Sequence, residues 1–155
     1  VDRNRVALRY DPKSGVEQLP EMTMGRTSPA ASAVRFPGQE GKLTDVCLVV
    51  CGGFDGRGVF LPSCEAHNER LNVWRPLGTD MAQGRNTQSF LTLGNTLYAL
   101  GGFNTTSILS DTLEKFDFEA GQCSTRPLRL PVPLAGFGAL GLPADAIPSL
   151  KKRTK

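Results

Sequence analysis

Four cysteines and a single histidine are the residues of this chain whose types and spacing could bind a metal. Cys47 and Cys51 are followed by Cys64 and His67, and thiolates together with imidazole are the ligands that zinc prefers. The other interpretation is that these are buried, reduced thiols that pack as small apolar side chains. A disulfide between Cys47 and Cys51 is excluded if both lie on one strand, because they would be roughly 13 Å apart.

A glycine-rich stretch, GGFDGRG at residues 52–58, could approach a phosphate through its backbone amides. The known phosphate-binding motifs require a helix after the glycines and a lysine or a third spaced glycine, whereas a strand is predicted here. The only histidine, His67, falls at a position where core packing is the expected role. We therefore expect no catalytic residue, no cofactor and no bound nucleotide.

The glycine-rich stretch belongs to an internal repeat. VVCGGFDGRG at 49–58 returns as YALGGFNTTS at 98–107, an offset of 101 minus 52, or 49 residues. The same offset relates further landmarks: Glu65 to Glu114, His67 to Phe116, Trp74 to Cys123, Met81 to Leu130 and Arg85 to Leu134. A partial earlier copy aligns Met22 and Arg26 with Met81 and Arg85. Because the offset places Cys51 and Cys64 opposite leucines, buried thiols are preferred to a metal site.

Short segments such as TDVCLVVCGG and NTLYALGG are rich in β-branched and apolar residues and are bounded by Gly, Asn and Asp, which is typical of strands. The second unit predicts four antiparallel strands at 86–93, 96–102, 112–118 and 122–126, with turns at Gly94-Asn95 and Ala120-Gly121. One such sheet cannot bury both of its apolar faces. Stacking against similar sheets around an axis, as the blades of a propeller do, solves this.

In these features the chain resembles the kelch-repeat family of β-propellers over residues 4 to 142. The landmarks that carry the resemblance are Gly52, Gly53, Trp74, Met81, Arg85, Gly101 and Gly102. The period of about 50 residues fits the family as well. The sequence departs from the family pattern at His67-Asn68, which replaces an aromatic-Asp pair, at Cys123, which replaces a tryptophan, and at Leu134, which replaces an arginine.

The resemblance implies an all-β fold with two full four-stranded kelch blades and flanking partial blades. The expected divisions are outer strands of a preceding blade (1–26), a first full blade (27–80), a second full blade (81–129), an inner strand of a next blade (130–145) and a basic tail (146–155). The first full blade contains about ten extra residues, an inserted hairpin at about 36–45. Two outer strands are expected at 4–10 and 16–19, and the last inner strand at 134–142.

Two full blades cannot close a ring, because propellers typically have four to eight. The missing blades belong either to a longer polypeptide, which we favour, or to a second chain that completes the ring. Further kelch blades, in the same or another chain, are therefore expected partners. Arg26 and Arg85 are expected to bridge neighbouring blades rather than to contact a ligand.

The charge of the chain argues against nucleic-acid binding. Four of the 18 Lys and Arg residues lie in the terminal KKRTK, so the rest of the chain has 14 cations against 15 Asp and Glu. No apolar run approaches the roughly 18 residues of a membrane span, so no membrane partner is expected. Reduced cysteines fit the cytoplasm, with a cytoskeletal association as a narrower possibility.

Recognition of a protein partner is the expected function, carried by loops on the rim of a rigid scaffold. The candidate contact residues lie in the loops after the two glycine pairs: Phe54, Asp55, Arg57, Phe60, Asn104, Thr105 and Thr106. The resemblance implies substrate recognition for a cullin-type ubiquitin ligase, or a cytoskeletal scaffold. The alternatives are a structural subunit of a larger assembly and, less favoured, a metal-dependent propeller enzyme, for which one histidine and two tyrosines are a poor ligand set.

Overall fold

The structure is a computed structural model, and it describes residues 3–37, 43–94, 96–106, 108–117 and 122–142. The described chain is all-β apart from one 3-10 turn, Arg3–Arg5. Its strands are β1 (Leu8–Asp11), β2 (Gly15–Gln18), β3 (Ala30–Pro37), β4 (Leu43–Cys51), β5 (Cys64–Asn68), β6 (Val73–Pro76), β7 (Arg85–Asn86), β8 (Ser89–Leu93), β9 (Thr96–Leu100), β10 (Phe103–Asn104), β11 (Thr112–Asp117) and β12 (Gln122–Arg129). No described helix is long and apolar enough to cross a membrane.

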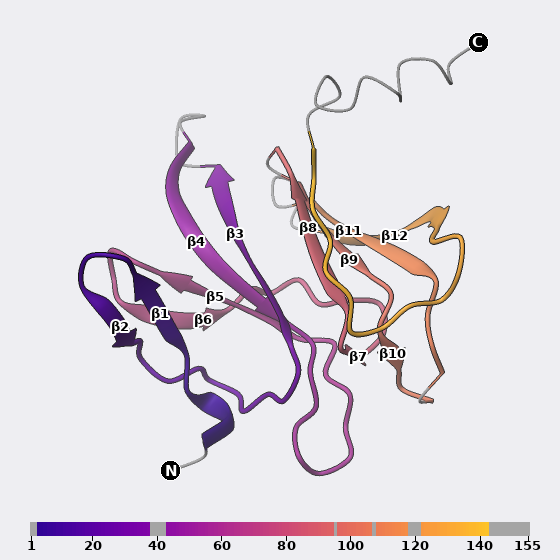
Figure 1. Cartoon of the computed structure of the whole chain (residues 1–155), viewed down its shortest axis with the longest axis horizontal. Helices are drawn as coiled ribbons and strands as arrows, with labels where there is room; N and C mark the ends of the chain where they lie inside the picture. Colours follow the sequence, from indigo (N-terminus) through magenta and orange to yellow (C-terminus); the bar gives the residue numbers. More distant parts are fainter. Residues whose placement is uncertain (1–2, 38–42, 95, 107, 118–121, 143–155) are drawn as a thin grey trace.

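Two four-stranded antiparallel sheets form the body of the structure, with the strand orders β3-β4-β5-β6 and β8-β9-β11-β12. Each sheet is an antiparallel meander; in the second, the short strand β10 (Phe103–Asn104) lies in the connection between β9 and β11 and pairs with β7. Figure 1 shows the first strands of the two sheets, β3 and β8, on the sides that face each other. The Ser32 hydroxyl lies 2.8 Å from the Thr92 hydroxyl and joins these two strands. This is the arrangement of two neighbouring propeller blades.

The main core fills the space between the two sheets. Its largest fully buried apolar side chains are Phe116 and Leu97 from the second sheet, and Val34 and Val49 come from the first. Phe90 packs edge-on against Phe116, with their ring centroids 6.3 Å apart. Apolar residues from both sheets thus share one core, so each sheet buries its apolar face against the other.

A short hairpin, β1 and β2, precedes the first sheet and packs beside it through a smaller core. Trp74 on β6 donates its indole N–H to the carbonyl of Pro20, at 2.9 Å, and packs with Leu19 and Met22. The predicted outer strands are therefore present, but the first begins at Leu8 because Arg3–Arg5 form a 3-10 turn.

The strand boundaries predicted for the second sheet need correction at the glycine pair and at the entry. β9 ends at Leu100 because Gly101 and Gly102 have φ values of 60° and 89°, outside the range of a strand. The predicted strand 86–93 is divided into β7 and β8 by Thr87, which has a φ of 49°. The last strand, β12, continues to Arg129. Asn95 and the Ala120-Gly121 turn lie outside the described residues.

The strand predicted at 134–142 is not formed in the described structure. The backbone of this segment makes single hydrogen bonds to surrounding turns, at Gly102, Ser110 and Thr87, and no ladder to a neighbouring strand. A strand requires such a ladder. In the extended β3–β4 hairpin, the strands reach Pro37 and restart at Leu43, so part of the predicted insertion lengthens this hairpin. The centre of the insertion, 38–42, and the tail, 143–155, are outside the described residues.

Candidate protein-interaction face

Buried ion pairs join each inter-sheet linker to the following sheet. Arg85 pairs with Glu114 on β11 and donates to the carbonyl of Gly101 at 2.9 Å and to the hydroxyl of Thr112 at 3.1 Å. Glu114 also accepts the backbone N–H of Ala82 at 2.6 Å. A charged pair this deeply buried requires such additional hydrogen bonds to offset its desolvation.

The pair Arg26–Glu65 repeats the arrangement one unit earlier. Arg26 donates to Glu65 on β5 at 3.0 Å and to the carbonyl of Gly52 at 2.9 Å. Glu65 accepts the backbone N–H of Thr23 at 2.7 Å. Both arginines therefore connect consecutive sheets, which is the structural role expected from their repeat positions, and both are buried. They hold the glycine pairs, from which the rim loops begin.

The first rim loop is organised by Asp55. Its carboxylate accepts the backbone N–H groups of Arg57 at 2.8 Å and Val59 at 3.0 Å. These two donors, Arg57 first, lower the pKa of Asp55 below its ordinary value. Phe54 and Phe60 face each other as a β-bridge, with their rings edge-on at 5.6 Å. Of the candidate contact residues in this loop, only Arg57 is fully exposed.

The second rim loop has the same construction, 49 residues later. Asn104 accepts the backbone N–H groups of Thr106 at 3.0 Å and Ile108 at 3.1 Å. Phe103 forms a β-bridge with Leu109, as Phe54 does with Phe60. Thr105 and Thr106 are exposed, and the Thr106 hydroxyl donates to Asn104 at 2.7 Å. Asn104 and Asp55 thus shape the loops through their side chains. The exposed candidate residues of the two loops, Arg57, Thr105 and Thr106, remain candidates for contact.

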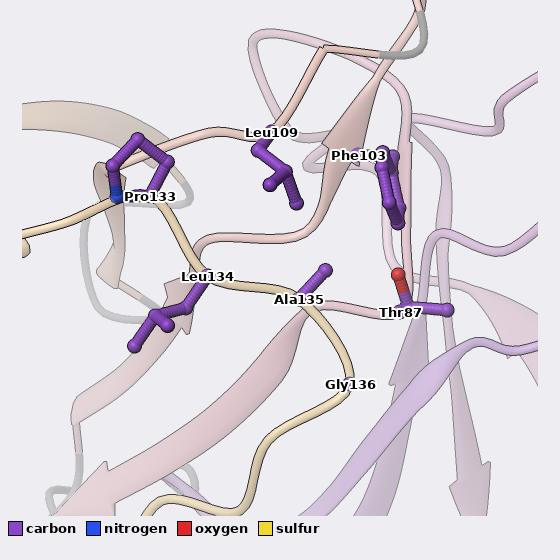
Figure 2. A pocket seen from close by; sticks show the side chains of 7 residues that line it. All are labelled: Thr87, Phe103, Leu109, Pro133, Leu134, Ala135 and Gly136. Atoms are coloured by element: carbon purple, nitrogen blue, oxygen red, sulfur yellow. The ribbon is translucent and has the colours of Figure 1, made fainter.

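A cavity of about 420 Å³, wide open to solvent, lies between the second rim loop and the last linker. Figure 2 shows its lining residues: Thr87, Phe103, Leu109, Pro133, Leu134, Ala135 and Gly136. None of these was a candidate contact residue at the level of the sequence. The repeat alignment did contain a signal, because Leu109 replaces Phe60 and Pro133 replaces Gly84. Both replacements alter the packing of a linker against its rim loop.

The last linker, 130–136, is held against the second sheet by the same backbone bonds as the linker 81–87 is against the first. Gly102 donates to the carbonyl of Leu134 at 2.8 Å, as Gly53 does to that of Arg85 at 2.9 Å. Gly136 donates to Thr87 at 2.8 Å. The backbone around the cavity is therefore held by hydrogen bonds that recur in both repeat units.

The cysteines differ from expectation. Cys51 and Cys64 lie directly opposite each other on β4 and β5, with their Cα atoms 4.1 Å apart, and form a disulfide. The prediction of reduced cysteines is wrong for this pair, because the register of two neighbouring strands cannot be known from the spacing of one strand. Cys47 is buried and is not part of this disulfide. Within the described ranges no group of three or more His, Cys, Asp and Glu is arranged to hold a metal.

The single histidine is a core residue. His67 is buried on β5, its ring centroid 5.2 Å from that of Trp74, and its Nε2 lies 3.2 Å from the amide oxygen of Asn72. This is the packing role expected for the aromatic position of the repeat.

Comparisons with known proteins agree with this architecture. Residues 84–127 match the family model described as the Kelch motif. The fold resembles a solved kelch-type propeller, "Structure of YjhT", with a TM-score of 0.67 and 14% identity, over 82% of this chain and 46% of that chain. No curated protein matches the sequence significantly.

Residues 84–127 thus carry a Kelch motif, in a chain whose fold resembles part of a β-propeller. The Kelch motif identifies the second sheet by sequence, and the structural likeness extends the propeller fold to most of the chain. The chain spans about half of the solved structure that it resembles.

Proposed function

We propose that this chain is a non-catalytic module that binds a protein partner through the face formed by its rim loops and linkers. Kelch repeats generally mediate protein interaction. The observation that carries the proposal is the apolar cavity beside the second rim loop, together with the exposed apolar side chains around it. Ile108, Leu109 and Leu134 have 61%, 42% and 38% of their surface exposed. Exposed apolar patches of this kind mark interaction sites.

Selection of peptides on the immobilised chain tests this proposal. Arg57 is the exposed cation of the first rim loop, and Arg70 is an exposed arginine in the turn between β5 and β6, at the other ends of the strands. Arg57→Glu is expected to weaken selected peptides at least five-fold, and the matched control Arg70→Glu to leave them unchanged. The absence of any enriched peptide, or equal effects of the two variants, contradicts binding at this face.

The family resemblance favours two finer roles, substrate recognition for a cullin-type ubiquitin ligase and a cytoskeletal scaffold. The first requires BTB and BACK domains in the same polypeptide or complex. Co-purification of a cullin with the protein from cells supports the first role, whereas co-sedimentation with filaments supports the second.

The cytoplasmic location expected for such roles is open to a direct test at the cysteines. The Cys51–Cys64 disulfide favours an oxidising compartment, because disulfides rarely persist in the cytosol. Maleimide labelling of the protein denatured directly from cells counts its thiols. Three or more labelled residues among Cys47, Cys51, Cys64 and Cys123 indicate a reduced pair and the cytoplasm; two or fewer indicate an oxidising compartment.

A second proposal concerns completion of the ring by further kelch blades in the same or another chain. Among the described residues the sheet formed by β1 and β2 has two strands, and Leu8, Tyr10 and Val16 are 63%, 71% and 68% exposed on it. A two-stranded sheet is marginal without further strands. Light scattering with circular dichroism separates the cases: a folded β-rich dimer supports a ring built from two chains, and an unfolded or aggregated monomer supports blades supplied by the same polypeptide or a host complex.

A further inference from the structure

The cavity beside the second rim loop corresponds to a place that an aromatic ring fills in the first sheet. There, Phe60 packs edge-on against Phe54, with centroids 5.6 Å apart and planes at 80°. In the second sheet, Phe103 forms the equivalent β-bridge with Leu109. The backbone is the same in both places, so the second has lost one ring that the first retains.

The linker on the other side of the cavity has changed as well. Gly84 approaches Phe60 so closely that a Cβ on it would collide with the Phe60 carbonyl. Pro133 occupies the aligned position in the last linker and is exposed, whereas Gly84 is buried. The linker keeps its backbone bonds, so the cavity of about 420 Å³ lies where the first sheet has the Phe60 ring and the second has the side chain of Leu109. That volume lies in the range of about 300–1,000 Å³ in which ligand pockets are found.

One residue that lines this apolar site, Thr87, has a polar atom without a hydrogen-bond partner. The hydroxyl oxygen of Thr87 is buried and makes no hydrogen bond, and the amide oxygen of Asn86, opposite Phe103 in the β7–β10 pair, is in the same condition. Figure 2 shows the Thr87 hydroxyl on the side of the residue that faces Phe103. A buried acceptor without a partner is costly, and a ligand that supplies a donor removes that cost.

We propose that this cavity receives a tryptophan or tyrosine side chain of the partner, an assignment that rests on the proposed protein-binding function. The aromatic ring packs against Phe103 as Phe60 packs against Phe54, between the aliphatic side chains of Leu109 and Leu134. The indole N–H or phenolic O–H donates to the Thr87 hydroxyl. Both side chains combine a large apolar body with one polar atom, and they are the commonest anchors in protein interfaces.

The isolated side chain can be tested before any partner is known. N-acetyltryptophanamide is added to the isotopically labelled whole chain, and amide signals are followed by NMR. We expect saturable shifts at Thr87, Phe103, Leu109 and Gly136, and at least five-fold weaker binding of N-acetylleucinamide. Equal binding of the two amides, or shifts spread over the whole chain, overturns the assignment.

The repeat supplies its own variants for the test. Leu109→Phe restores the ring of the first sheet and is expected to abolish binding of N-acetyltryptophanamide, with the circular dichroism spectrum unchanged. Phe60→Leu, the reciprocal change in the first loop, is the matched control and leaves binding unaltered. Binding that survives Leu109→Phe in the folded variant overturns the assignment.

A third variant tests the hydrogen bond. Thr87→Val keeps the shape of the residue and removes only the hydroxyl that has no partner. It is expected to weaken N-acetyltryptophanamide roughly three- to ten-fold, the usual contribution of one hydrogen bond, and to leave N-acetylphenylalaninamide unchanged. An equal effect on both amides contradicts a bond to Thr87.

The outcomes separate the pocket from the general function. If selected peptides bind through the rim loops but Leu109→Phe does not affect them, the aromatic pocket is wrong and the proposed function stands. If N-acetyltryptophanamide binds as expected while no peptide is ever enriched, the pocket stands and the protein-binding function fails.

Discussion

The linkers 81–87 and 130–136 have the same backbone arrangement, but the first has a charged side chain, Arg85, where the second has an apolar one, Leu134. Each donates to and accepts from its rim loop at equivalent atoms, and each places a residue with positive φ, Thr87 or Gly136, at the same turn. Arg85 in the first linker is buried in an ion pair. Its counterpart, Leu134, is partly exposed and lines a cavity.

This difference shows which contacts of the repeat depend on the backbone and which depend on side chains. The docking of a linker depends on backbone N–H and C=O groups and on glycine pairs, so it tolerates the exchange of Arg for Leu. The ion pair depends on two side chains, Arg85 in the linker and Glu114 on β11, and disappears when one is replaced. A linker without its arginine presents apolar surface instead, as the exposed Leu134 does.

The largest effect is expected from copying the second linker into the first. Arg85→Leu leaves Glu114 buried without its partner and is expected to destabilise the chain by about 3–5 kcal/mol, measured by urea unfolding. The reverse change, Leu134→Arg, affects a partly exposed residue and is expected to stay within about 0.5 kcal/mol.

The double variant Arg85→Leu with Glu114→Leu separates lost attraction from uncompensated charge. Replacement of both partners is expected to restore most of the stability, because a buried ion pair can be exchanged for apolar residues at little cost. A double variant as unstable as Arg85→Leu alone would show that the geometry of the pair, rather than its charge balance, holds the sheets together.

A second prediction compares two glycines at the linkers. Gly102 has a φ of 89°, and a Cβ on it would lie 2.5 Å from the carbonyl oxygen of Asn86. Gly136 has a φ of 65° and nothing within 4 Å. Gly102→Ala is expected to cost about 2–4 kcal/mol, from backbone strain and overpacking, and Gly136→Ala about 1–2 kcal/mol from strain alone. Equal losses in thermal unfolding would contradict the close approach at Gly102.

A third prediction compares the disulfide of the first sheet with its counterpart in the second. Cys51 and Cys64 occupy the positions of Leu100 and Leu113, which are paired across β9 and β11. Replacement of both cysteines by serine is expected to cost about 2–3 kcal/mol, because the disulfide closes a loop of 13 residues. Leucine at both positions, copied from the second sheet, is expected to recover part of this loss. A melting temperature that does not respond to reductant would contradict the bond.

The smallest effect distinguishes the two rim loops by pH. The pKa of Asp55 is lowered by hydrogen bonds from the backbone of Arg57 and Val59, so the folded loop favours the carboxylate. The resulting stabilisation is complete above the ordinary pKa of the residue and is lost as the pH falls through the lowered pKa. Amide signals of 57 and 59 are therefore expected to move in acid. Those of Thr106 and Ile108, bonded to the uncharged Asn104, are expected to stay.

Exchange of the two residues checks this assignment. Asp55→Asn is expected to remove the acid response of the first loop, and Asn104→Asp to introduce one into the second. An acid response that persists in Asp55→Asn would assign it to another group.

Much of the fold could be predicted from the sequence, because the same pattern of strands and glycines occurs twice along the chain. The 49-residue offset, the glycine pairs and the strand punctuation lead to two four-stranded sheets, and the structure contains both. The alignment also anticipated the structural role of Arg26 and Arg85. The strand at 134–142 was predicted wrongly, because a strand depends on a neighbour that local sequence does not contain.

The candidate site was predicted less completely. Phe54, Asp55 and Asn104 were found in the rim loops, but the sequence did not show that the last two shape the loops through backbone N–H groups. The cavity was missed because Thr87, Leu109 and Pro133 come from three segments that meet only in the folded chain.

The sequence by itself determined the repeat, the all-β class and the places where the loops emerge, because spacing and glycine positions set local backbone geometry. Only the tertiary structure decided which side chains meet across sheets. The Arg–Glu pairs, the Cys51–Cys64 disulfide and the cavity at Leu109 all depend on strand register and on the approach of one linker to one loop. These are distances between segments far apart in the chain, and no local pattern of residues encodes them.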